Sequence, residues 1–537
     1  MDLFSNTPIQ WVVLAAFIAA VLHGIITFIR HRRFYKNLPK PPHSFFWGHL
    51  KLVGETLRLF PNNVHIQLAI TTLSQKYKLP RLFYIDLWPF GPDFLVITDP
   101  NLALQISNFR NLYKHHIARE VVNGVVGKDN IVTTDGPLWK KLHNMVAPSF
   151  SDSQVKNMVG MIAEEVMTFR QILLDRARDG QPFNLEETIN RLSFDIIGKT
   201  TFGFPFESQR NGSPILTDFH EVTNSWLNER KTWNPLKRLL SRQKKIAATK
   251  RMDSYLEKEI RKRFETLCRD QADLTQKRGL TIVDLLLRES LEQNSQKGWP
   301  GTLDAETLRL IVVNIKAFLL AGSGTTADTL SFTYMLLTTH PEVVEKLRAE
   351  HDRVFSPSIE TTYAMLQGSP YKINDLEYTT NVIKETLRYF PIGFSARSYD
   401  DFITYNGIQY PAKDHMVCMA QHTMQMNPEL FPNPGKFDPD RFSRNESPPH
   451  AWRPFEKGPR SCVGKTLAMD EMRVILLLTS RDFDFDCHGL KPYKEPAVDW
   501  WDMDTMFGER AYPELIFEAK PRGGMMMTVK RSQHGAN

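Results

Sequence analysis

The feature that most restricts the fold of this chain is an uncharged apolar run at residues 11–29, WVVLAAFIAAVLHGIITFI. As a helix, a run of this length measures about 28 Å, the thickness of one hydrocarbon bilayer core. The basic sequence RHRRFYK follows directly, whereas Asp2 is the only charged side chain before the run. Because Lys and Arg favour the cytoplasmic flank of a membrane helix, we expect the rest of the chain to lie in the cytosol.

We interpret the run as an uncleaved, single-pass anchor, because a signal peptide has a basic start and a shorter apolar core. The predicted division is a lumenal tail at 1–10, a transmembrane anchor at 11–29 and a basic, proline-rich linker at 30–45. The LPKPP sequence should make the linker stiff and extended. Residues 46–537 show no repeat and no low-complexity break, which predicts one large domain.

The composition is globular: 42% of the 537 residues are hydrophobic and 24% are charged. The net charge of +7 allows an acidic partner or an anionic membrane surface. No zinc-finger spacing and no basic run interleaved with aromatics is found, so we expect no nucleic-acid partner. The four cysteines lie far apart, which argues against a disulfide scaffold.

The periodicity predicts a mainly α fold with a minor β-sheet region (α+β). Residues 81–100 suggest two short strands around a Gly-Pro turn, and Asn406-Gly407 suggests a hairpin turn. Residues 304–340 have a helical pattern, and a helix of that length measures about 55 Å. Residues 228–263 are rich in Arg and Lys, which indicates a solvated helix face or, alternatively, a surface near lipid.

Several common catalytic motifs are absent, including H-E-x-x-H, G-x-S-x-G and the P-loop. His115 and His116 are adjacent, and on a regular helix they would point about 100° apart, unsuited to one metal ion. The segment Gly322-Ser-Gly-Thr-Thr-Ala327 fits the G-x-G-x-x-[GA] fingerprint, so an NAD(P)-dependent dehydrogenase is an alternative. The apolar run before it is long enough for a helix, which weighs against that alternative.

The same segment would form a weakened part of a helix. Gly322 and Gly324 each reduce helix stability by about 1 kcal/mol relative to alanine. Thr325 and Thr326 can donate to carbonyls one turn earlier, which bends a helix. Such a site could hold a small molecule and pass protons, and close packing against another helix is the alternative interpretation.

Cys462 lies in the sequence FEKGPRSCVG, just before a run with helical spacing. Basic neighbours, backbone N–H groups and the dipole of the following helix each stabilise a thiolate. A reactive cysteine would fit this description, and so would a thiolate ligand to iron.

Four motifs, in order along the chain, resemble those of the cytochrome P-450 monooxygenases. They are the oxygen-binding helix Ala321-Gly-Ser-Gly-Thr-Thr326, the E-x-x-R motif Glu385-Thr-Leu-Arg388, the P-E-R-F-like Pro439-Asp-Arg-Phe442, and the haem-binding signature Phe455-x-x-Gly-x-Arg-x-Cys-x-Gly464. The resemblance covers essentially the whole chain. It implies the cytochrome P-450 fold, a single large domain behind the N-terminal transmembrane helix, with haem b (iron protoporphyrin IX) as cofactor.

The resemblance also implies roles for individual residues. Cys462 would be the axial thiolate ligand of the iron, and Thr325 the catalytic residue that steadies oxygen and helps to deliver protons. The other implied cofactor contacts are Phe455, Arg460, Arg397, Trp139, His143, Ala321 and Gly322. The implied structural ion network is Glu385, Arg388 and Arg441. The pocket-lining positions implied by analogy are Val313, Ala317, Phe318, Ile392 and Phe394.

Two positions depart from the family pattern. Gly324 stands where the family usually has an acid, which removes the usual acid–alcohol relay, and Asp328 or an additional water is the candidate substitute. His143 stands where W-x-x-x-R usually ends, and a histidine would make a weaker, pH-dependent propionate contact that Lys141 could reinforce.

The resemblance implies insertion of one atom of O2 into an apolar small-molecule substrate. Electrons would come from an NADPH-cytochrome reductase, with cytochrome b5 as a further candidate donor, and Lys140 and Lys141 could meet its acidic surface. We expect an endoplasmic-reticulum membrane protein with a cytosolic catalytic domain. FLLAGSGTTADT and AWRPFEKGPRSC look like sequences of filamentous-fungal members, which suggests secondary-metabolite biosynthesis. A fatty-acid or alkane hydroxylase and a non-catalytic haem protein are alternatives.

Overall fold

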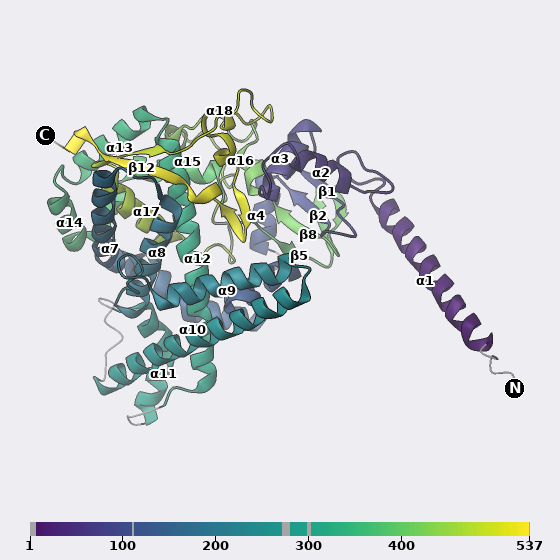
Figure 1. The fold of residues 1–537 in the computed structure, drawn as a ribbon, viewed down its shortest axis with the longest axis horizontal. Helices are drawn as coiled ribbons and strands as arrows, with labels where there is room; N and C mark the ends of the chain where they lie inside the picture. Colours follow the sequence, from purple (N-terminus) through teal and green to yellow (C-terminus); the bar gives the residue numbers. More distant parts are fainter. Residues whose placement is uncertain (1–6, 110–111, 271–279, 298–301, 536–537) are drawn as a thin grey trace.

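The computed structural model describes residues 7–109, 112–270, 280–297 and 302–535, and these are mainly helical with small sheets, as the periodicity predicts (Figure 1). The α-helices are α1 (Thr7–Phe34), α2 (Leu50–Leu57), α3 (Ile66–Lys76), α4 (Pro100–Phe109), α5 (His116–Val126), α6 (Gly136–Val146), α7 (Asp152–Asp179), α8 (Leu185–Phe202), α9 (Pro214–Lys231), α10 (Pro235–Arg269), α11 (Ile282–Lys297), α12 (Ala305–Leu337), α13 (Pro341–Val354), α14 (Ile359–Gly368), α15 (Glu377–Tyr389), α16 (Gln421–Gln425), α17 (Lys465–Thr479) and α18 (Asp504–Phe507). The strands are β1 (Leu82–Ile85), β2 (Phe94–Ile97), β3 (Tyr113–Lys114), β4 (Phe183–Asn184), β5 (Arg397–Ser398), β6 (Phe402–Tyr405), β7 (Ile408–Pro411), β8 (Met416–Met419), β9 (Phe483–Cys487), β10 (Glu514–Ile516), β11 (Glu518–Lys520) and β12 (Met526–Arg531).

The largest sheet joins segments that are distant in sequence, in the order β1-β2-β8-β5-β3. The two strands predicted in residues 81–100 are confirmed as β1 and β2, an antiparallel pair. The predicted Asn406-Gly407 turn is also confirmed, since it joins β6 to β7 and both residues have positive φ (51° and 78°).

Helix α12 runs through the middle of the body, and most of its residues are buried (Figure 1). The side chain of Asp304 caps its first turn by accepting from the backbone N–H of Thr307 at 2.8 Å. The helix continues without a break through Gly322 and Gly324. The G-x-G-x-x-[GA] match therefore lies inside a helix rather than at a strand–helix turn, so it provides no dinucleotide-binding loop.

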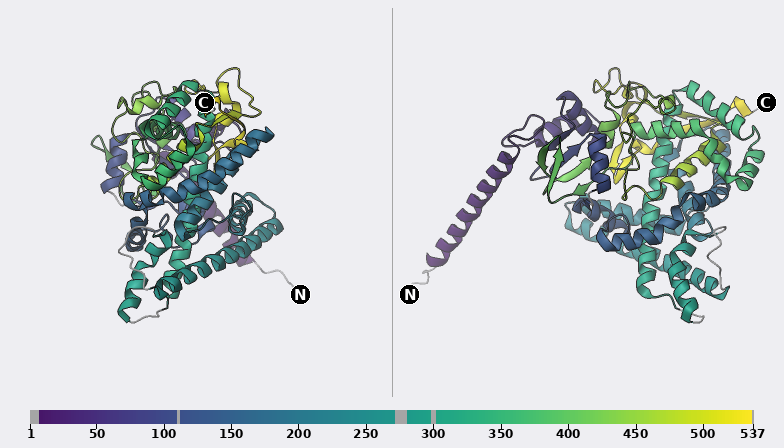
Figure 2. Two further views of the ribbon diagram at one scale, coloured as in Figure 1. Left: turned by 90° about the vertical axis from the view of Figure 1, so that its left-hand side faces the viewer. Right: turned by 180° about the vertical axis from the view of Figure 1, so that it is seen from behind.

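Helix α1 extends away from the body, whereas its last turn is attached to the first sheet (Figures 1 and 2). The window 11–34 is long and apolar enough to cross a membrane, and its side chains are largely exposed. Arg32 is buried and its guanidinium pairs with Asp86, while Tyr35 is fully buried. The beginning of the predicted linker therefore packs onto the domain.

Helices α9 and α10 pack side by side and carry the basic residues of 228–263. Most of the cations on α10 are exposed, which fits both a solvated face and a surface near lipid. Large apolar side chains are exposed beside them. Trp233 is 100% exposed, Leu236 64%, Leu239 51% and Leu240 49%.

The structure corrects the geometry expected for His115 and His116. His115 is not inside a helix: it caps α5, and its ring accepts from the backbone N–H of Ile117. The two imidazole rings consequently contact each other, with centroids 4.2 Å apart, instead of diverging.

Candidate active site

Cys462 lies in a tight loop that ends at the first turn of α17. The backbone N–H of Cys462 donates to the carbonyl of Phe455 at 2.9 Å and closes the loop. Gly458 has φ +77°, and a Cβ at this position would lie 2.5 Å from the carbonyl oxygen of Ser107. Only glycine therefore fits at position 458, and it lets the loop pack against the end of α4.

The thiol of Cys462 opens into a cavity of about 310 Å³ between this loop and α12. The predicted site residues Ala321, Gly322, Thr325, Phe455 and Arg460 all line it. Trp139 and His143 of α6 line it too. The walls are mainly apolar, as in sites for organic ligands.

Thr325 presents its side chain to the cavity from α12. Its hydroxyl donates to the carbonyl of Ala321 at 2.7 Å, which confirms the predicted bond back by one turn. The hydroxyl of Thr326 is buried and has no partner among the described residues, so the same expectation is wrong for Thr326. Gly322 packs tightly on α8, where an added Cβ would lie 2.8 Å from Ile197.

One end of the cavity is strongly cationic. Lys114 lines the cavity, and Arg397 is its direct partner across the β3–β5 ladder. Arg460 donates to the carbonyl of Thr134 at 2.7 Å and pairs with Asp135. Among the described residues, nothing accepts from Nη1 of Arg397, although this atom is buried.

The cations at this end shift one another's pKa values. Burial, together with the charges of Arg397 and Arg460, lowers the pKa of Lys114 to about 7. Burial and the charge of Arg397 lower the pKa of Arg460 to about 10, against the attraction of Asp135. An anion placed here would reduce the repulsion among these cations. It would also accept a hydrogen bond from the unpaired guanidinium nitrogen of Arg397. Sequence reasoning did not identify Lys114, because β3 has only two residues and no motif.

Trp139 and His143 are stacked, with ring centroids 4.9 Å apart, and both belong to α6. The guanidinium of Arg460 lies over the Trp139 ring at 4.1 Å. Trp139 thus positions Arg460 by a cation–π contact, His143 stacks on Trp139, and both side chains line the cavity.

The environment of Cys462 differs from the expectation in one respect. Enclosure raises the pKa of the thiol above its ordinary value, although the backbone N–H of Gly464 and the charges of Lys465 and Lys114 lower it. The predicted stabilisation of a thiolate by backbone N–H groups and cations is therefore present, but burial outweighs it. A cationic metal opposite the sulfur would supply the missing stabilisation.

Glu385, Arg388 and Arg441 form the predicted ion network, which is fully buried. Both guanidinium groups share Oε1 of Glu385, at 2.8 Å from Arg388 and 3.0 Å from Arg441. Backbone carbonyls such as that of Gln425 accept the remaining N–H groups. The network fixes α15 to the loop that leads to Cys462.

The pocket-lining expectation is confirmed for Phe318 only. Ala317 and Ile392 are buried in the core cluster instead, and Phe394 packs against the rings of His65 and Phe94. Val313 is also buried, near Gly127. Helix phase explains most of the misses on α12, because the face of the helix that meets the cavity follows Phe318, Ala321 and Thr325.

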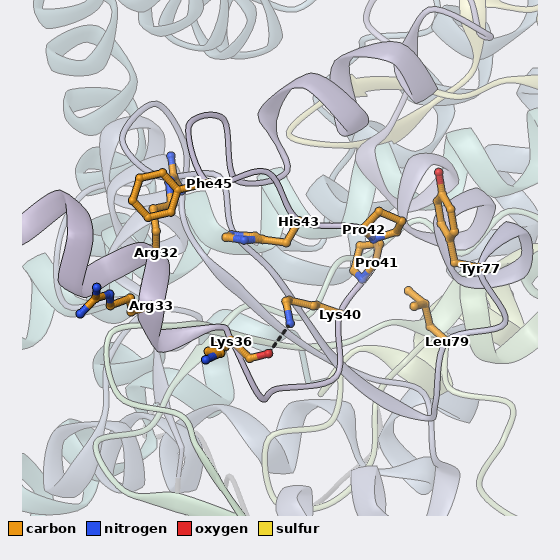
Figure 3. Close-up of a pocket in the computed structure, with 10 residues that line it drawn as sticks. All are labelled: Arg32, Arg33, Lys36, Lys40, Pro41, Pro42, His43, Phe45, Tyr77 and Leu79. Atoms are coloured by element: carbon orange, nitrogen blue, oxygen red, sulfur yellow. Dashed lines mark hydrogen bonds between the residues drawn. The ribbon is translucent and has the colours of Figure 1, made fainter.

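A second cavity, of about 720 Å³, lies at the foot of α1 and contains cations rather than catalytic groups. Arg33, Lys36 and Lys40 line it together with Pro41 and Phe45 (Figure 3). Lys40 donates to the carbonyl of Lys36 at 3.1 Å. This basic surface shares no residue with the Cys462 cavity.

Comparison with known proteins agrees with this geometry. The family model for cytochrome P-450 matches residues 39–498. The chain belongs to the cytochrome P-450 family. It is 30% identical over 93% of its length to cytochrome P-450 monooxygenase polC of Polytolypa hystricis, covering 90% of that protein. It is 31% identical over 87% of its length to cytochrome P-450 monooxygenase acrF of Aspergillus aculeatus, covering 98% of that protein.

More distant relatives share the same architecture. This cytochrome P-450 is 26% identical over 93% of its length to cytochrome P-450 3A7 of Homo sapiens, covering 94% of that protein. A crystal structure of the cytochrome P-450DA heme domain superposes with a TM-score of 0.70 at 22% identity, covering 92% of this chain and 97% of that one. The fold is therefore that of a cytochrome P-450, and the family is one of haem-dependent monooxygenases that use O2 and electrons from a redox partner.

Proposed function

We propose that this protein is a membrane-anchored monooxygenase that uses haem b to insert one atom of O2 into an apolar organic substrate. The observation that carries the proposal is the cavity itself, which has the thiol of Cys462 on one side, Thr325 on the other and unsatisfied cations at one end. These features fit an iron porphyrin with its propionates directed to Lys114, Arg397 and Arg460. When bound, haem supplies the activation of O2.

The chain's own residues would have distinct tasks. Cys462 would donate its sulfur to the iron from the loop before α17, and Phe455 would keep water from the sulfur. Arg397 and Arg460 would hold carboxylates through charged hydrogen bonds. His143 and Trp139 would keep Arg460 in place, and Thr325 would hold and pass protons on the opposite side.

Electrons would come from a separate NADPH-dependent reductase. The only dinucleotide fingerprint found in the sequence lies inside α12, which argues against a nicotinamide site of the chain's own. Lys140 and Lys141 are both exposed on α6, the helix that also carries Trp139, and they are candidate contacts for an acidic reductase surface. Cytochrome b5 is a further candidate donor.

Two exposed apolar features support attachment to the endoplasmic-reticulum membrane. One is α1, with the basic cavity at its foot facing the headgroups. The other is the patch formed by Trp233, Leu236, Leu239 and Leu240, which suits the membrane interface. An apolar substrate dissolved in lipid would then be close to the protein.

The substrate class is proposed as an apolar scaffold of fungal secondary metabolism, oxidised by hydroxylation, epoxidation or a related step. Two relatives, from Polytolypa hystricis and Aspergillus aculeatus, are monooxygenases by name. A fatty-acid or alkane hydroxylase is the second candidate, because the described cavity walls near Phe318 and Phe150 are equally apolar.

The test is the reduced carbon monoxide complex of the purified full-length protein. We expect a red-shifted Soret band in the wild type and its loss in Cys462→Ser, because an alcohol does not replace the thiolate. The control is Cys268→Ala, a buried cysteine on α10 that does not line the cavity. A colourless wild-type protein, or one without the shifted band, would refute the proposal. Binding of haem without NADPH oxidation by any supplied reductase would favour a non-catalytic haem protein.

A further inference from the structure

The side chain missing at Gly324 leaves a notch on α12, and Glu518 fills it. A Cβ at Gly324 would lie 2.6 Å from Oε1 of Glu518 and 3.6 Å from its carboxyl carbon. The carboxyl group of Glu518 therefore rests directly against the helix backbone. Glu518 begins β11, which packs on α12 near the C-terminus of the chain (Figure 1).

Asp328 is a second carboxyl group at the same place. It lies four residues after Gly324 and so shares its face of α12. It is fully buried, and no N–H or O–H group of the described residues donates to either of its oxygens. Among the neighbouring charged groups, the carboxyl of Glu518 acts most strongly on the pKa of Asp328. A hydrogen bond between two such carboxyl groups requires that one of them carries a proton.

The surrounding charges also favour a proton on the pair. Burial and the negative charges of Glu518 and Glu186 raise the pKa of Asp328 well above its usual range. Burial, with the charge of Glu186, raises the pKa of Glu518 to about 7, although Lys520 lowers it. Lys520 pairs with Glu186 at 2.9 Å, so its positive charge only partly offsets these effects. His220 on α9 faces Lys520 and Glu186.

The position filled by Glu518, at Gly324, is one residue away along α12 from the hydroxyl that faces the cavity. Thr325 directly follows Gly324, and its side chain lines the cavity. Its hydroxyl proton is used in the bond to Ala321, which leaves the oxygen free to accept a proton. Glu518 is only half-buried, so the pair can exchange protons with water at the β10–β11 hairpin.

We propose that Glu518 and Asp328 hold a shared proton beside Thr325 and relay it to the cavity, so that an acid from β11 takes the place of one on α12. Reduction of one atom of O2 to water, with insertion of the other, consumes two protons and two electrons, the electrons coming from NADPH through the reductase. In the relay step the O–H bond of the pair breaks, its electrons stay on the carboxylate, and the proton passes through Thr325 or an adjacent water. The pair then regains a proton from solvent through Glu518. This inference rests on the proposed function.

The first test needs no turnover. Infrared difference spectra of the resting full-length protein, recorded from pH 5 to pH 9, should show a protonated carboxyl band that is lost with a midpoint near 7 and shifts in heavy water. In Glu518→Gln the titration near pH 7 should disappear. The matched control is Glu514→Gln, which removes a carboxylate paired with Arg522 from the same hairpin and should leave the band unchanged. Glu471, with a pKa of about 8, contributes a carboxyl band to both proteins, so the comparison is the difference between them. Wild-type spectra that do not differ from those of Glu518→Gln near pH 7 would overturn the pair.

The second test measures whether electrons from NADPH reduce O2 to water or to hydrogen peroxide. With NADPH, O2 and a supplied reductase, the ratio of hydrogen peroxide to water formed should rise roughly tenfold in Glu518→Gln. Loss of a fully positioned acid typically changes a rate by ~10²–10⁴, and the expected effect is smaller because a water molecule can still deliver protons. The double variant Gly324→Asp with Glu518→Ala moves the acid from β11 to α12. It should restore the wild-type ratio of hydrogen peroxide to water. An unchanged ratio in Glu518→Gln would overturn the inference.

These experiments distinguish failure of the proposed function from failure of the proton relay. A wild type that lacks the shifted carbon monoxide band refutes the proposed function. Variants that keep the band but leave both the titration and the peroxide ratio unchanged refute only the relay.

Discussion

At the scale of single residues, the chemistry of this site depends on positions where a side chain is absent or where a polar atom is unpaired. Gly458 leaves room for the carbonyl of Ser107, and Gly324 leaves room for the carboxyl of Glu518. Arg397 has one buried guanidinium nitrogen for which the described part of the chain provides no acceptor. The two spaces at the glycines are specific, because the group that occupies each one comes from another part of the chain.

The loop around Cys462 gives a prediction at this scale. Gly458→Ala should reduce haem retention and lower the unfolding midpoint, because a Cβ would clash with Ser107 and the positive φ would cost about 1–3 kcal/mol. Haem content per protein and thermal unfolding measure the effect.

The matched control for the loop is Gly435→Ala, which has open space around its Cβ position. It should behave like the wild type. Equal haem content in the two variants would show that the close approach at Gly458 is not required.

At the scale of elements, α8 and α17 meet at a buried acid. Glu471 on α17 is 2% exposed and lines the cavity, and Ser193 of α8 donates to it at 2.7 Å. Burial raises its pKa to about 8, against the effect of this hydrogen bond. The carboxyl group at the contact between the two helices therefore stays protonated up to about pH 8.

The sign of the pH dependence follows from this shift. Between about pH 4.5 and pH 8 the folded state keeps a proton on Glu471 that the unfolded state has lost, so the free energy of unfolding falls as pH rises. Glu471→Gln should remove this contribution, on the order of a few kcal/mol, and flatten the profile.

Thermal unfolding of Glu471→Gln and the wild type at pH 5 and pH 8 tests the prediction. The variant should gain stability relative to the wild type at the higher pH. Glu495→Gln, an exposed control, should follow the wild-type profile. A constant difference between the Glu471 variant and the wild type across this range would contradict the assignment.

At the scale of the molecule, the exposed helix α1 and the packed body are separate structures joined at one turn (Figure 2). The joint is made by buried Arg32 and Tyr35 and by the ring of Phe28, which contacts Phe45 and Trp88. Side chains at 11–26 contribute little to the body, because they are exposed.

Deletion of residues 1–26 should therefore leave the unfolding midpoint of the body unchanged and weaken its binding to vesicles. Residual binding should come from the apolar patch beside α10, so that Trp233→Ser with Leu236→Ser in the truncated chain should abolish it. Flotation with vesicles and thermal unfolding provide the measurements. A lower midpoint after truncation would show that α1 is part of the core.

The sequence by itself determined the features that depend on neighbours along the chain. The length of the apolar run, the helical period of α12, the Asn406-Gly407 turn and the motif around Cys462 are local patterns. They were sufficient to predict the fold class, the family resemblance and the main chemical groups of the cavity, such as Cys462, Thr325 and Arg460.

Only the tertiary structure decided how distant groups meet. It placed Lys114 opposite Arg397, Glu518 in the notch at Gly324, and Ser193 on Glu471. Charge, burial and pKa depend on distances through space, which spacing along the chain does not specify. For the same reason the helix phase that selects Phe318 over Val313 for the cavity became clear only once α12 was packed.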